Sequence, residues 1–474
     1  MATGINSVPL PDSPPPSRPE RVRIITLGCA KNEVDSEEIA GVLRGQGHEI
    51  SGDENADVTI INTCGFLESA KQESIRTIQQ AVAAKGNGRV IVAGCLAQRL
   101  GEDLRRLAPG ADLYVGVGQM ARFGDLVRDV FGHSESRVDV TPPQHRWADV
   151  ESRTRSGQPW SAYLKISEGC DHRCTFCTIP SFRGNHDSKP IERIIEEANH
   201  LVRTGAKELN LIAQDVTQYG YDLYREFTLP RLLRELNQVP GVEWIRLLYF
   251  YPNRLTDAVL DAMAECEHVL PYVDIPLQHV HPDTLRRMKR PWDGDRYLAL
   301  FEKVRARLPR VAIRTTFIVG FPGETEAEFS ALLDFVKAAR LDRVGAFTFS
   351  QEPGTPSFDM PGQVPARVKQ ERFDRLMRAQ QGISLAVNRS YEGQSVRVLV
   401  EEAKDGWVAG RSFRDAPEID GWVYAQGVAS PGTFVDVQVT EGKIHDLYGH
   451  LAGASAPSRR TLTPLTMAAP ARPQ

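Results

Sequence analysis

Two successive series of alternating strand and helix patterns constrain the fold of this 474-residue chain more than any other feature. The first series has four apolar runs, each followed by a helical pattern, at residues 22–29, 57–64, 89–95 and 111–118. Strands that alternate with helices form parallel sheets, because each helix returns the chain to the same edge of the sheet. We therefore expect a parallel α/β domain over residues 21–133, with its first helix capped by Asp35 or Ser36.

A second series follows a polar, proline-containing stretch at residues 134–159, which we expect to be a linker. Its six apolar runs lie at residues 161–167, 207–213, 243–250, 271–277, 311–320 and 343–350. A closed (β/α) barrel needs eight units, so six units predict a partial, open barrel. With the helical pattern at residues 365–390, this domain would span residues 160–390. Its reactive loops are expected at the carboxyl ends of the strands.

The last folded part has five short β patterns, separated by Gly, Asp and Pro, within residues 391–450. This spacing predicts a small antiparallel β-barrel of the oligonucleotide-binding kind. The Pro-rich residues 1–20 and 451–474 lack apolar periodicity, and we expect both tails to be disordered. Residues 1–20 also lack the apolar core of a signal peptide, and no run reaches the roughly 18 apolar residues of a membrane span. These features predict a cytoplasmic protein without a membrane partner.

Charge and cysteine content narrow the classes of function. Lys and Arg number 57 and Asp and Glu 61, a net charge of −4 that gives no general affinity for nucleic acid or anionic membranes. Seven cysteines are too few for a disulfide scaffold in a chain of this length. Their uneven spacing indicates metal ligands or reactive thiols instead.

The densest group is Cys170, Cys174 and Cys177, directly after the first strand of the second series. Three thiolates on one loop can hold one face of a metal centre, and on a four-iron cubane they leave one iron open to an external chelator. A zinc site would need a fourth ligand, for which His172 is a poor candidate because we expect the loop to turn its side chain outward. A redox dithiol would use Cys174 and Cys177 and leave Cys170 unused. Both remain as alternatives.

A second group is distributed along the first series. Cys29, Cys64 and Cys95 each follow a predicted strand, and parallel strands end at the same edge of a sheet. We therefore expect the three thiols to share one cluster site, with buried apolar thiols as the alternative. Cys266 falls on an amphipathic helix and is expected to be structural. His279 and His281 follow a strand and are expected to line the barrel mouth, without a metal role.

The Cys-x-x-x-Cys-x-Phe-Cys loop, with Phe176 at its aromatic position, resembles the radical S-adenosylmethionine (SAM) superfamily. In that superfamily the open iron chelates SAM, and reduction yields a 5′-deoxyadenosyl radical. The resemblance makes Phe176 a candidate SAM contact, as it does the turn within residues 314–328. The other candidates are listed by position: Gln214 and Asp215 after the second strand, and Gly320, Gly323 and Glu324 in the turn. A tight turn with a helix cap is the alternative for the last three.

Two cysteine groups followed by a small β-barrel resemble the radical SAM methylthiotransferases, over nearly the whole chain from Arg21 to His450. The resemblance implies an N-terminal cluster domain, a radical SAM barrel and a C-terminal TRAM barrel. It also implies two [4Fe–4S] clusters, SAM as radical source and as methyl donor, and an external electron donor such as a flavodoxin or ferredoxin. Hydrogen-atom abstraction requires no side-chain acid or base, so we name none.

Four segments are similar to the RimO-type branch, which modifies the β-carbon of an aspartate in protein twelve of the small ribosomal subunit: residues 164–184, 211–224, 270–279 and 410–424. Charge points the same way, because residues 392–450 hold ten acidic and five basic residues. A barrel that binds RNA should be basic, whereas an acidic one suits a basic ribosomal protein, so we expect no direct tRNA binding. The alternatives are methylthiolation of a tRNA adenosine beside the anticodon, and a non-catalytic RNA-binding iron–sulfur protein.

Overall fold

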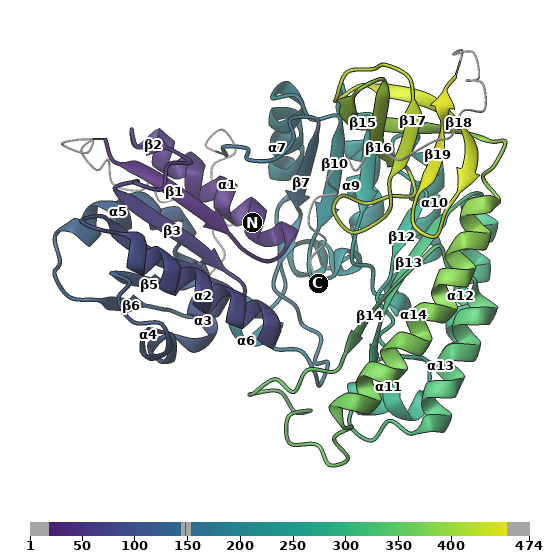
Figure 1. Cartoon of the computed structure of the whole chain (residues 1–474), viewed down its shortest axis with the longest axis horizontal. Coiled ribbons are helices and arrows are strands. Elements are labelled where there is room, and N and C mark those ends of the chain that lie inside the picture. The colour runs from purple at the N-terminus through teal and green to yellow at the C-terminus, as the bar shows by residue number, and fades with distance from the viewer. Residues whose placement is uncertain (1–18, 144–146, 148–152, 453–474) are drawn as a thin grey trace. The chain divides into compact units, whose positions relative to one another are not determined.

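The structure is a computed structural model that describes residues 19–143, 147 and 153–452. The chain divides into two compact units, residues 1–154 and 155–474 (Figure 1). The tails predicted to be disordered, residues 1–20 and 451–474, lie outside the described residues except for two positions each. Within the described part, no helix has the length and apolar character needed to cross a bilayer.

The first unit is built on a parallel six-stranded sheet in the order β2-β1-β3-β4-β5-β6. Its strands are β1 (Arg21–Thr26), β2 (Glu49–Ile50), β3 (Val58–Thr63), β4 (Arg89–Gly94), β5 (Leu113–Val115) and β6 (Arg137–Asp139). Its helices are α1 (Ala30–Gly45), α2 (Glu68–Ala84), α3 (Cys95–Leu100), α4 (Glu102–Leu107), η1 (Val117–Arg122) and α5 (Phe123–Phe131). Ile60 and Ile61, successive in β3, pack into separate apolar clusters, because alternate residues of a strand face opposite layers. The predicted α/β architecture is confirmed.

Two details of this unit differ from the sequence prediction. Helix α1 begins at Ala30 rather than at a cap formed by Asp35 or Ser36. The hydroxyl of Ser36 instead bonds Thr26 at 2.8 Å, so a tertiary contact uses the side chain expected to cap. The stretch at residues 134–159 contains β6, which extends the sheet, and the buried Arg153 forms an ion pair with Glu37 at 2.6 Å. This stretch is therefore partly structural rather than a simple linker.

The second unit begins with six parallel strands in two three-stranded sheets, β11-β10-β7 and β12-β13-β14. The strands are β7 (Ser161–Lys165), β10 (Glu208–Ile212), β11 (Trp244–Leu247), β12 (Tyr272–Asp274), β13 (Ala312–Val319) and β14 (Arg343–Thr348). The two sheets adjoin beyond β11, where the backbone N–H of Phe250 donates to the carbonyl of Asp274 at 2.8 Å. This places β7 and β14 at opposite edges, the open six-unit arrangement that the sequence predicted.

Helices cover this sheet and bury one continuous apolar core. They are α6 (Ile179–Arg183), α7 (Ile191–Arg203), α8 (Tyr221–Tyr224), α9 (Leu229–Leu236), α10 (Asp257–Glu265), α11 (Pro282–Met288), α12 (Gly294–Arg307), α13 (Glu326–Ala339) and α14 (Ala366–Arg389), with short 3₁₀ turns η3 (Val216–Gln218) and η4 (Pro252–Arg254). Cys266 directly follows α10 and is buried in this core, as expected of a structural thiol.

The last part is a closed barrel in the order β15-β16-β17-β19-β18, drawn in yellow-green in Figure 1. Its strands are β15 (Ser395–Lys404), β16 (Trp407–Ser412), β17 (Val423–Gln426), β18 (Phe434–Gly442) and β19 (Leu447–Leu451). We expected antiparallel pairing throughout, but β17 and β19 are parallel. A closed ring with an odd number of strands cannot alternate in direction all the way round, so one parallel pair is required.

The β16–β17 loop (residues 413–422) joins this barrel to the open sheet at the amino ends of its strands. Asp420 accepts a hydrogen bond from the hydroxyl of Tyr272 at 2.6 Å, and Asp415 pairs with Arg343 at 2.6 Å. Tyr272 and Arg343 are the first residues of β12 and β14. The contacts of the β16–β17 loop therefore occupy the end of the sheet opposite to the one where the sequence places the reactive loops.

Candidate metal centres

The first cysteine group lies at one edge of the six-stranded sheet. Cys64 and Cys95 directly follow the neighbouring strands β3 and β4, and Cys29 precedes α1 after the adjacent β1. The side chain is exposed at Cys29, half-buried at Cys64 and buried at Cys95. The topology thus brings three thiols, far apart in sequence, to the carboxyl ends of three adjacent strands.

Asn32 links the loops that carry these thiols. This fully buried side chain donates from Nδ2 to the carbonyl of Leu27 at 2.7 Å and to that of Thr63 at 3.1 Å. Its Oδ1 accepts from Sγ of Cys95 at 3.6 Å. Sequence reasoning missed Asn32, because a single asparagine inside a helix carries no signal of contacts with residues 31 and 63 positions away.

A glycine beside each cysteine lets the three loops approach closely. Gly28 has φ +100°, and a Cβ there would lie 2.7 Å from Cβ of Cys64. A Cβ on Gly65 would lie 2.9 Å from Cα of Leu96, and one on Gly94 would lie 2.3 Å from the Asn62 side chain. These glycines were visible as Gly-Cys or Cys-Gly pairs, a signal that sequence reasoning did not use.

The second group lies on a loop whose two ends are held together by the short strands β8 (Ser167–Glu168) and β9 (Asp187–Ser188), which pair antiparallel. Cys170 is buried, and Cys174 and Cys177 are half-buried. The N–H of Cys170 donates to Gly184 at 3.0 Å and that of Cys177 to Cys174 at 3.1 Å. The loop is therefore fixed by hydrogen bonds of its own backbone.

The protonation of these thiols bears on what they can bind. Burial, with the nearby Cys174 as a further cause, raises the pKa of Cys170 and that of Cys177 to about 12. A bound cation reverses this preference, because a coordinating thiol is deprotonated. Three sulfur donors on one fixed loop fit an iron–sulfur cluster that leaves one iron open.

His172 does not supply a fourth ligand. We expected this side chain to turn outward, but its Nε2 lies 2.7 Å from Asp215, and its ring stacks on Tyr251 with centroids 3.7 Å apart. These two contacts make the imidazole a structural part of the loop rather than a metal ligand. The donor set is therefore three sulfurs, which disfavours the closed zinc site that the sequence left open.

Arg290 also lies over the Tyr251 ring and reaches the cysteine loop. Its Cζ is 4.2 Å from the Tyr251 ring centroid, and its Nη1 is 3.9 Å from Sγ of Cys174. Its Nη2 donates to the carbonyl of Pro276. Burial alone would lower the pKa of Arg290, but the Cys174 sulfur and Tyr251 outweigh it and raise that pKa. No local sequence pattern predicted Arg290, because Arg290 and Cys174 are 116 residues apart.

The predicted SAM contacts after β10 support the cysteine loop. Asp215 accepts from the N–H of Thr217 at 2.9 Å through Oδ1, while its Oδ2 faces His172. Gln214 donates to Glu168 at 2.6 Å. Phe176 is half-buried against an apolar cluster of Met288, Phe321 and Phe349. The structure thus brings Asp215 next to the loop, where it holds His172.

The turn after β13 uses its own backbone donors. The N–H of Gly320 donates to Glu324 at 2.8 Å and that of Gly323 to Gly362 at 2.8 Å. Glu324 also pairs with Arg372 at 2.8 Å, and burial raises the pKa of Glu324 to about 7 in spite of that pairing. With these N–H groups engaged and Thr325 capping α13, the geometry favours the tight turn with a helix cap over an open anion site.

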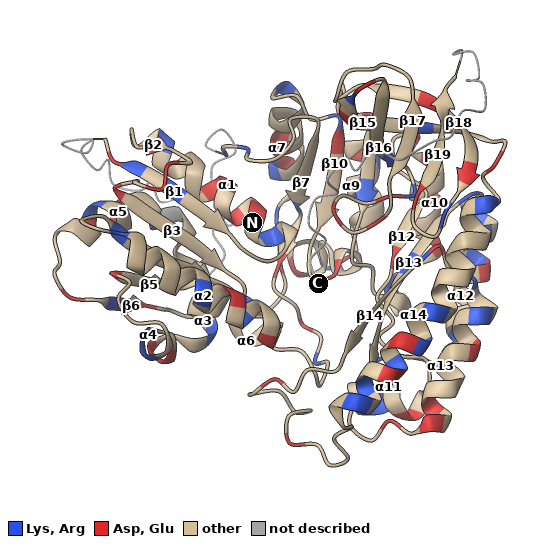
Figure 2. Cartoon of the chain, viewed as in Figure 1, with Lys and Arg blue, Asp and Glu red and all other residues tan. Residues whose placement is uncertain are grey.

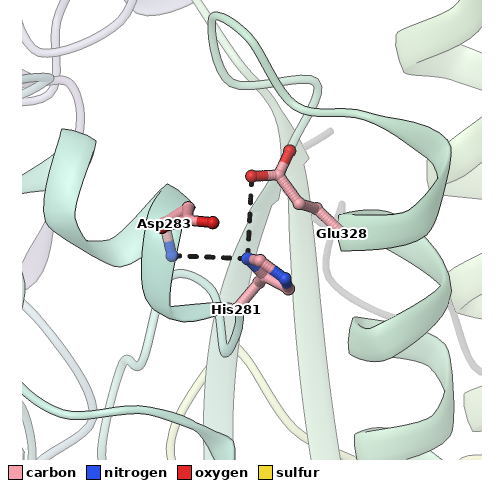
Figure 3. A group of neighbouring side chains, drawn as sticks. All are labelled: His281, Asp283 and Glu328. Atoms are coloured by element: carbon pink, nitrogen blue, oxygen red, sulfur yellow. Dashed lines mark hydrogen bonds and ion pairs between the residues drawn. The ribbon is translucent and has the colours of Figure 1, made fainter.

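His281, Asp283 and Glu328 gather beside this turn (Figure 3). Nδ1 of His281 accepts from the backbone N–H of Asp283 at 3.3 Å, which caps α11. Glu328 accepts from Arg287 at 2.9 Å and belongs to the capping box of α13. Helix caps therefore account for this group. His279, fully buried nearby, has its pKa lowered to about 3 by burial.

Three family models match the chain in succession. They are "Uncharacterized protein family UPF0004" at residues 21–116, "Radical SAM superfamily" at residues 164–336 and "TRAM domain" at residues 393–451. The second match covers the Cys170–Cys177 loop and the open-barrel strands from the end of β7 through β13, whereas β14 lies beyond it. Membership of that superfamily implies a [4Fe–4S] cluster and SAM as cofactors.

Curated relatives resemble the chain over most of its length. A protein of Moorella thermoacetica named ribosomal protein uS12 methylthiotransferase RimO is 46% identical over 91% of this chain and 99% of its own. A protein of the same name from Desulforamulus reducens is 45% identical over 91% of this chain and 99% of its own.

Solved structures share the fold at low sequence identity. The radical SAM methyltransferase TsrM of Kitasatospora setae, with tryptophan and a SAM analogue bound, gives a TM-score of 0.54 at 13% identity and covers 81% of this chain and 79% of its own. A second TsrM structure, with cobalamin and a [4Fe–4S] cluster bound, gives a TM-score of 0.53 at 14% identity and covers 83% and 81%.

Proposed function

Because this chain belongs to the RimO family of radical SAM methylthiotransferases, we propose that it inserts a methylthio group at the β-carbon of an aspartate in ribosomal protein uS12. The observation that carries the proposal is the 46% identity over 91% of the chain to a relative named for that reaction. The two fixed groups of three cysteines, one in each compact unit, support it independently.

In this proposal Cys170, Cys174 and Cys177 hold one [4Fe–4S] cluster and Cys29, Cys64 and Cys95 hold a second. When bound, the cluster on Cys170, Cys174 and Cys177 and SAM supply the radical that removes a hydrogen atom from an unactivated carbon. The site of Cys29, Cys64 and Cys95 serves sulfur insertion. The electron comes from an external donor of the flavodoxin or ferredoxin class. SAM contacts by Phe176 and Gln214 are part of the proposal. The turn after β13 and Asp215 are instead assigned to hydrogen bonds within the protein.

Residues of the protein itself hold the two groups of cysteine sulfurs in position. The Cys170–Cys177 loop is held by its backbone bonds and by the His172–Asp215 contact of 2.7 Å, so the three sulfurs keep their places before any group binds. Asn32 does the same for the first cysteine group by joining the loops after β1, β3 and β4. A fixed set of donors lowers the entropy lost when a group binds.

The net acidic charge of the last barrel supports a basic protein as substrate, and Figure 2 marks the positions of its acidic and basic residues along the ribbon. Four charged side chains are buried: Arg411, Arg414, Asp415 and Asp420. Without them, residues 392–450 still present eight acidic and three basic side chains. Such a surface attracts a basic protein and repels phosphate. It therefore disfavours the tRNA-modifying alternative.

The direct test is mass spectrometry of uS12 and of tRNA hydrolysates from cells with the gene, without it, and with a Cys170→Ala, Cys174→Ala, Cys177→Ala variant. We expect an aspartate of uS12 to gain the mass of SCH₃ in place of H only with the unaltered gene. A gene-dependent label on a tRNA adenosine, with unlabelled uS12, would establish the sister activity instead. SAM cleavage to 5′-deoxyadenosine by the reduced protein excludes the binding-only alternative.

A further inference from the structure

Two features of the Arg290 side chain are not explained by packing within the fold. Its Nη1 lies 3.9 Å from Sγ of Cys174, one of the three sulfurs assigned above to a cluster. Its Nε is buried and has no hydrogen-bond partner within the described residues. A buried N–H without an acceptor is costly, so such a group points to a missing partner. A cluster on Cys174 would place sulfur acceptors beside this guanidinium.

A stacked column holds the guanidinium in this place. His172, from the cysteine loop, stacks on Tyr251 at 3.7 Å with an interplanar angle of 10°. The guanidinium of Arg290 lies over the same ring, with Cζ 4.2 Å from the ring centroid. At one end of the column, His172 bonds Asp215. At the other end, Arg290 donates to the carbonyl of Pro276. The cation–π contact and the carbonyl bond keep the charge beside the sulfur.

The loops of four neighbouring strands contribute to this column. His172 lies after β7, Asp215 after β10, Tyr251 after β11, and Pro276 and Arg290 after β12. All are on the carboxyl-end side of the sheet, on the same side as the cysteine loop. The position of the guanidinium is therefore set by the barrel itself rather than by one flexible segment.

We propose that Arg290 raises the reduction potential of the cluster on Cys170, Cys174 and Cys177 by placing a positive charge and N–H donors against its sulfurs. This rests on the proposed function, which assigns the cluster to those residues. Reduction adds one electron, taken from a ferredoxin- or flavodoxin-class donor that is oxidised by one electron, and no covalent bond changes. A nearby cation and N–H···S bonds stabilise the more negative, reduced form, which makes the potential less negative.

Arg290 is a positioning residue in this proposal, because it acts through the cysteine sulfur. Its effect is therefore measured as a potential rather than as turnover. The full-length chain carrying Cys29→Ala, Cys64→Ala and Cys95→Ala is reconstituted with iron and sulfide, so that one cluster is observed. The reduced cluster is then quantified by electron paramagnetic resonance during titration with dithionite.

Arg290→Gln should lower the ratio of reduced to oxidised cluster at a fixed potential by about tenfold or more, equivalent to about 59 mV for one electron. Arg290→Lys, which keeps the charge but loses the planar fork, should fall between the two. The matched control is Arg287→Gln, three residues away, whose guanidinium bonds Thr284 and Glu328 instead of a sulfur. It should change the ratio by less than about twofold, because its charge is not held against the cluster.

An unchanged potential in Arg290→Gln, or an equal shift in Arg287→Gln, would overturn the proposal. If Arg290→Gln binds no cluster, the cluster potential is measured in Arg290→Lys and Tyr251→Leu instead. Potentials in both variants equal to that of the protein with Arg290 and Tyr251 unaltered would refute the proposal. Failure of the unaltered Cys170–Cys177 loop to bind iron would instead refute the proposed function. The two failures are thus distinguished by iron content.

Discussion

Arg411 of β16 and Glu208 of β10 form an ion pair across two parts of the second unit, with Nη2 and Oε2 2.5 Å apart and side chains only 2% and 0% exposed. Arg246 of β11 reaches the other oxygen of Glu208 at 3.0 Å. One carboxylate thus holds two guanidiniums, from the open barrel and from the closed barrel. Burial raises the pKa of Glu208, but Arg411 and Arg246 outweigh burial and lower it to about 2.

Replacing Glu208 by Gln should lower the free energy of unfolding of the second unit by about 3–5 kcal/mol, because the buried Arg246 loses its acidic partner and Arg411 keeps only Glu401. Denaturant unfolding measures this. The matched control is Glu243→Gln, which removes a carboxylate that pairs with Arg397 of the closed barrel at 2.8 Å but is 43% exposed. It should cost no more than about 1 kcal/mol. Equal losses would show that burial does not distinguish the two pairs.

The same carboxylate predicts an acid-dependent stability. A lowered pKa in the folded state contributes stability that is present above the ordinary value of 4.5 and is lost as the pH falls through about 2. The difference in free energy of unfolding between the unaltered protein and Glu208→Gln should therefore be constant above pH 4.5 and shrink toward pH 2. Unfolding curves of both proteins across this range test it. A difference that does not shrink would contradict the assigned ionisation.

The two cysteine groups should be separable in iron content and in chemistry. Anaerobic reconstitution should give about eight irons per chain, and replacing either group of three cysteines by Ala should leave about four. Loss of Cys170, Cys174 and Cys177 should abolish formation of 5′-deoxyadenosine from SAM. Loss of Cys29, Cys64 and Cys95 should leave that cleavage and abolish the methylthio product, because the groups lie in different compact units. Retained cleavage in the first variant would reverse the assignment of roles.

Gly28→Ala should disturb the first cysteine group selectively. The new Cβ would lie 2.7 Å from Cβ of Cys64, in addition to the strain of a side chain at φ +100°. We expect about four irons per chain instead of about eight, with SAM cleavage retained. Gly47→Ala is the control, since its φ is +87° but nothing lies within 4 Å of the added Cβ. Equal iron loss in both variants would attribute the effect to backbone strain alone.

Charge reversal on the exposed face of the last barrel should slow association with uS12. Asp405, Asp436 and Glu441 are exposed and suit Lys substitution, whereas Asp415 and Asp420 are engaged in the β16–β17 loop contacts. We expect the triple variant to lower the association rate more than it raises the dissociation rate, with an effect that fades as salt rises. Binding kinetics of the full chain at two salt concentrations measure this. An unchanged association rate would place the docking surface elsewhere.

How far sequence predicts this molecule depends on the range of the contacts. The edge position of Cys64 and Cys95 follows from strand ends alone, because parallel topology fixes where strands stop. The acid side chains at Asp415 and Asp420 read as surface charge, yet they are buried by Tyr272, Arg314 and Arg343. Such pairs join residues 72 or more positions apart, which no local pattern encodes. Arg290 and Asn32 were not predicted from the sequence, because their contacts with the cysteines also join residues far apart along the chain.

The β16–β17 loop has a consequence for how such enzymes can be recombined. Its residues fit arginines and a tyrosine at the amino ends of the open-barrel strands, so the last barrel is matched to its own neighbour. A chimera that takes this barrel from a relative would bury unmatched charges unless Glu208, Arg246, Arg314 and Arg343 find their counterparts. The last barrel is therefore not freely exchangeable between relatives on its own, because the residues on both sides of this interface would have to change together.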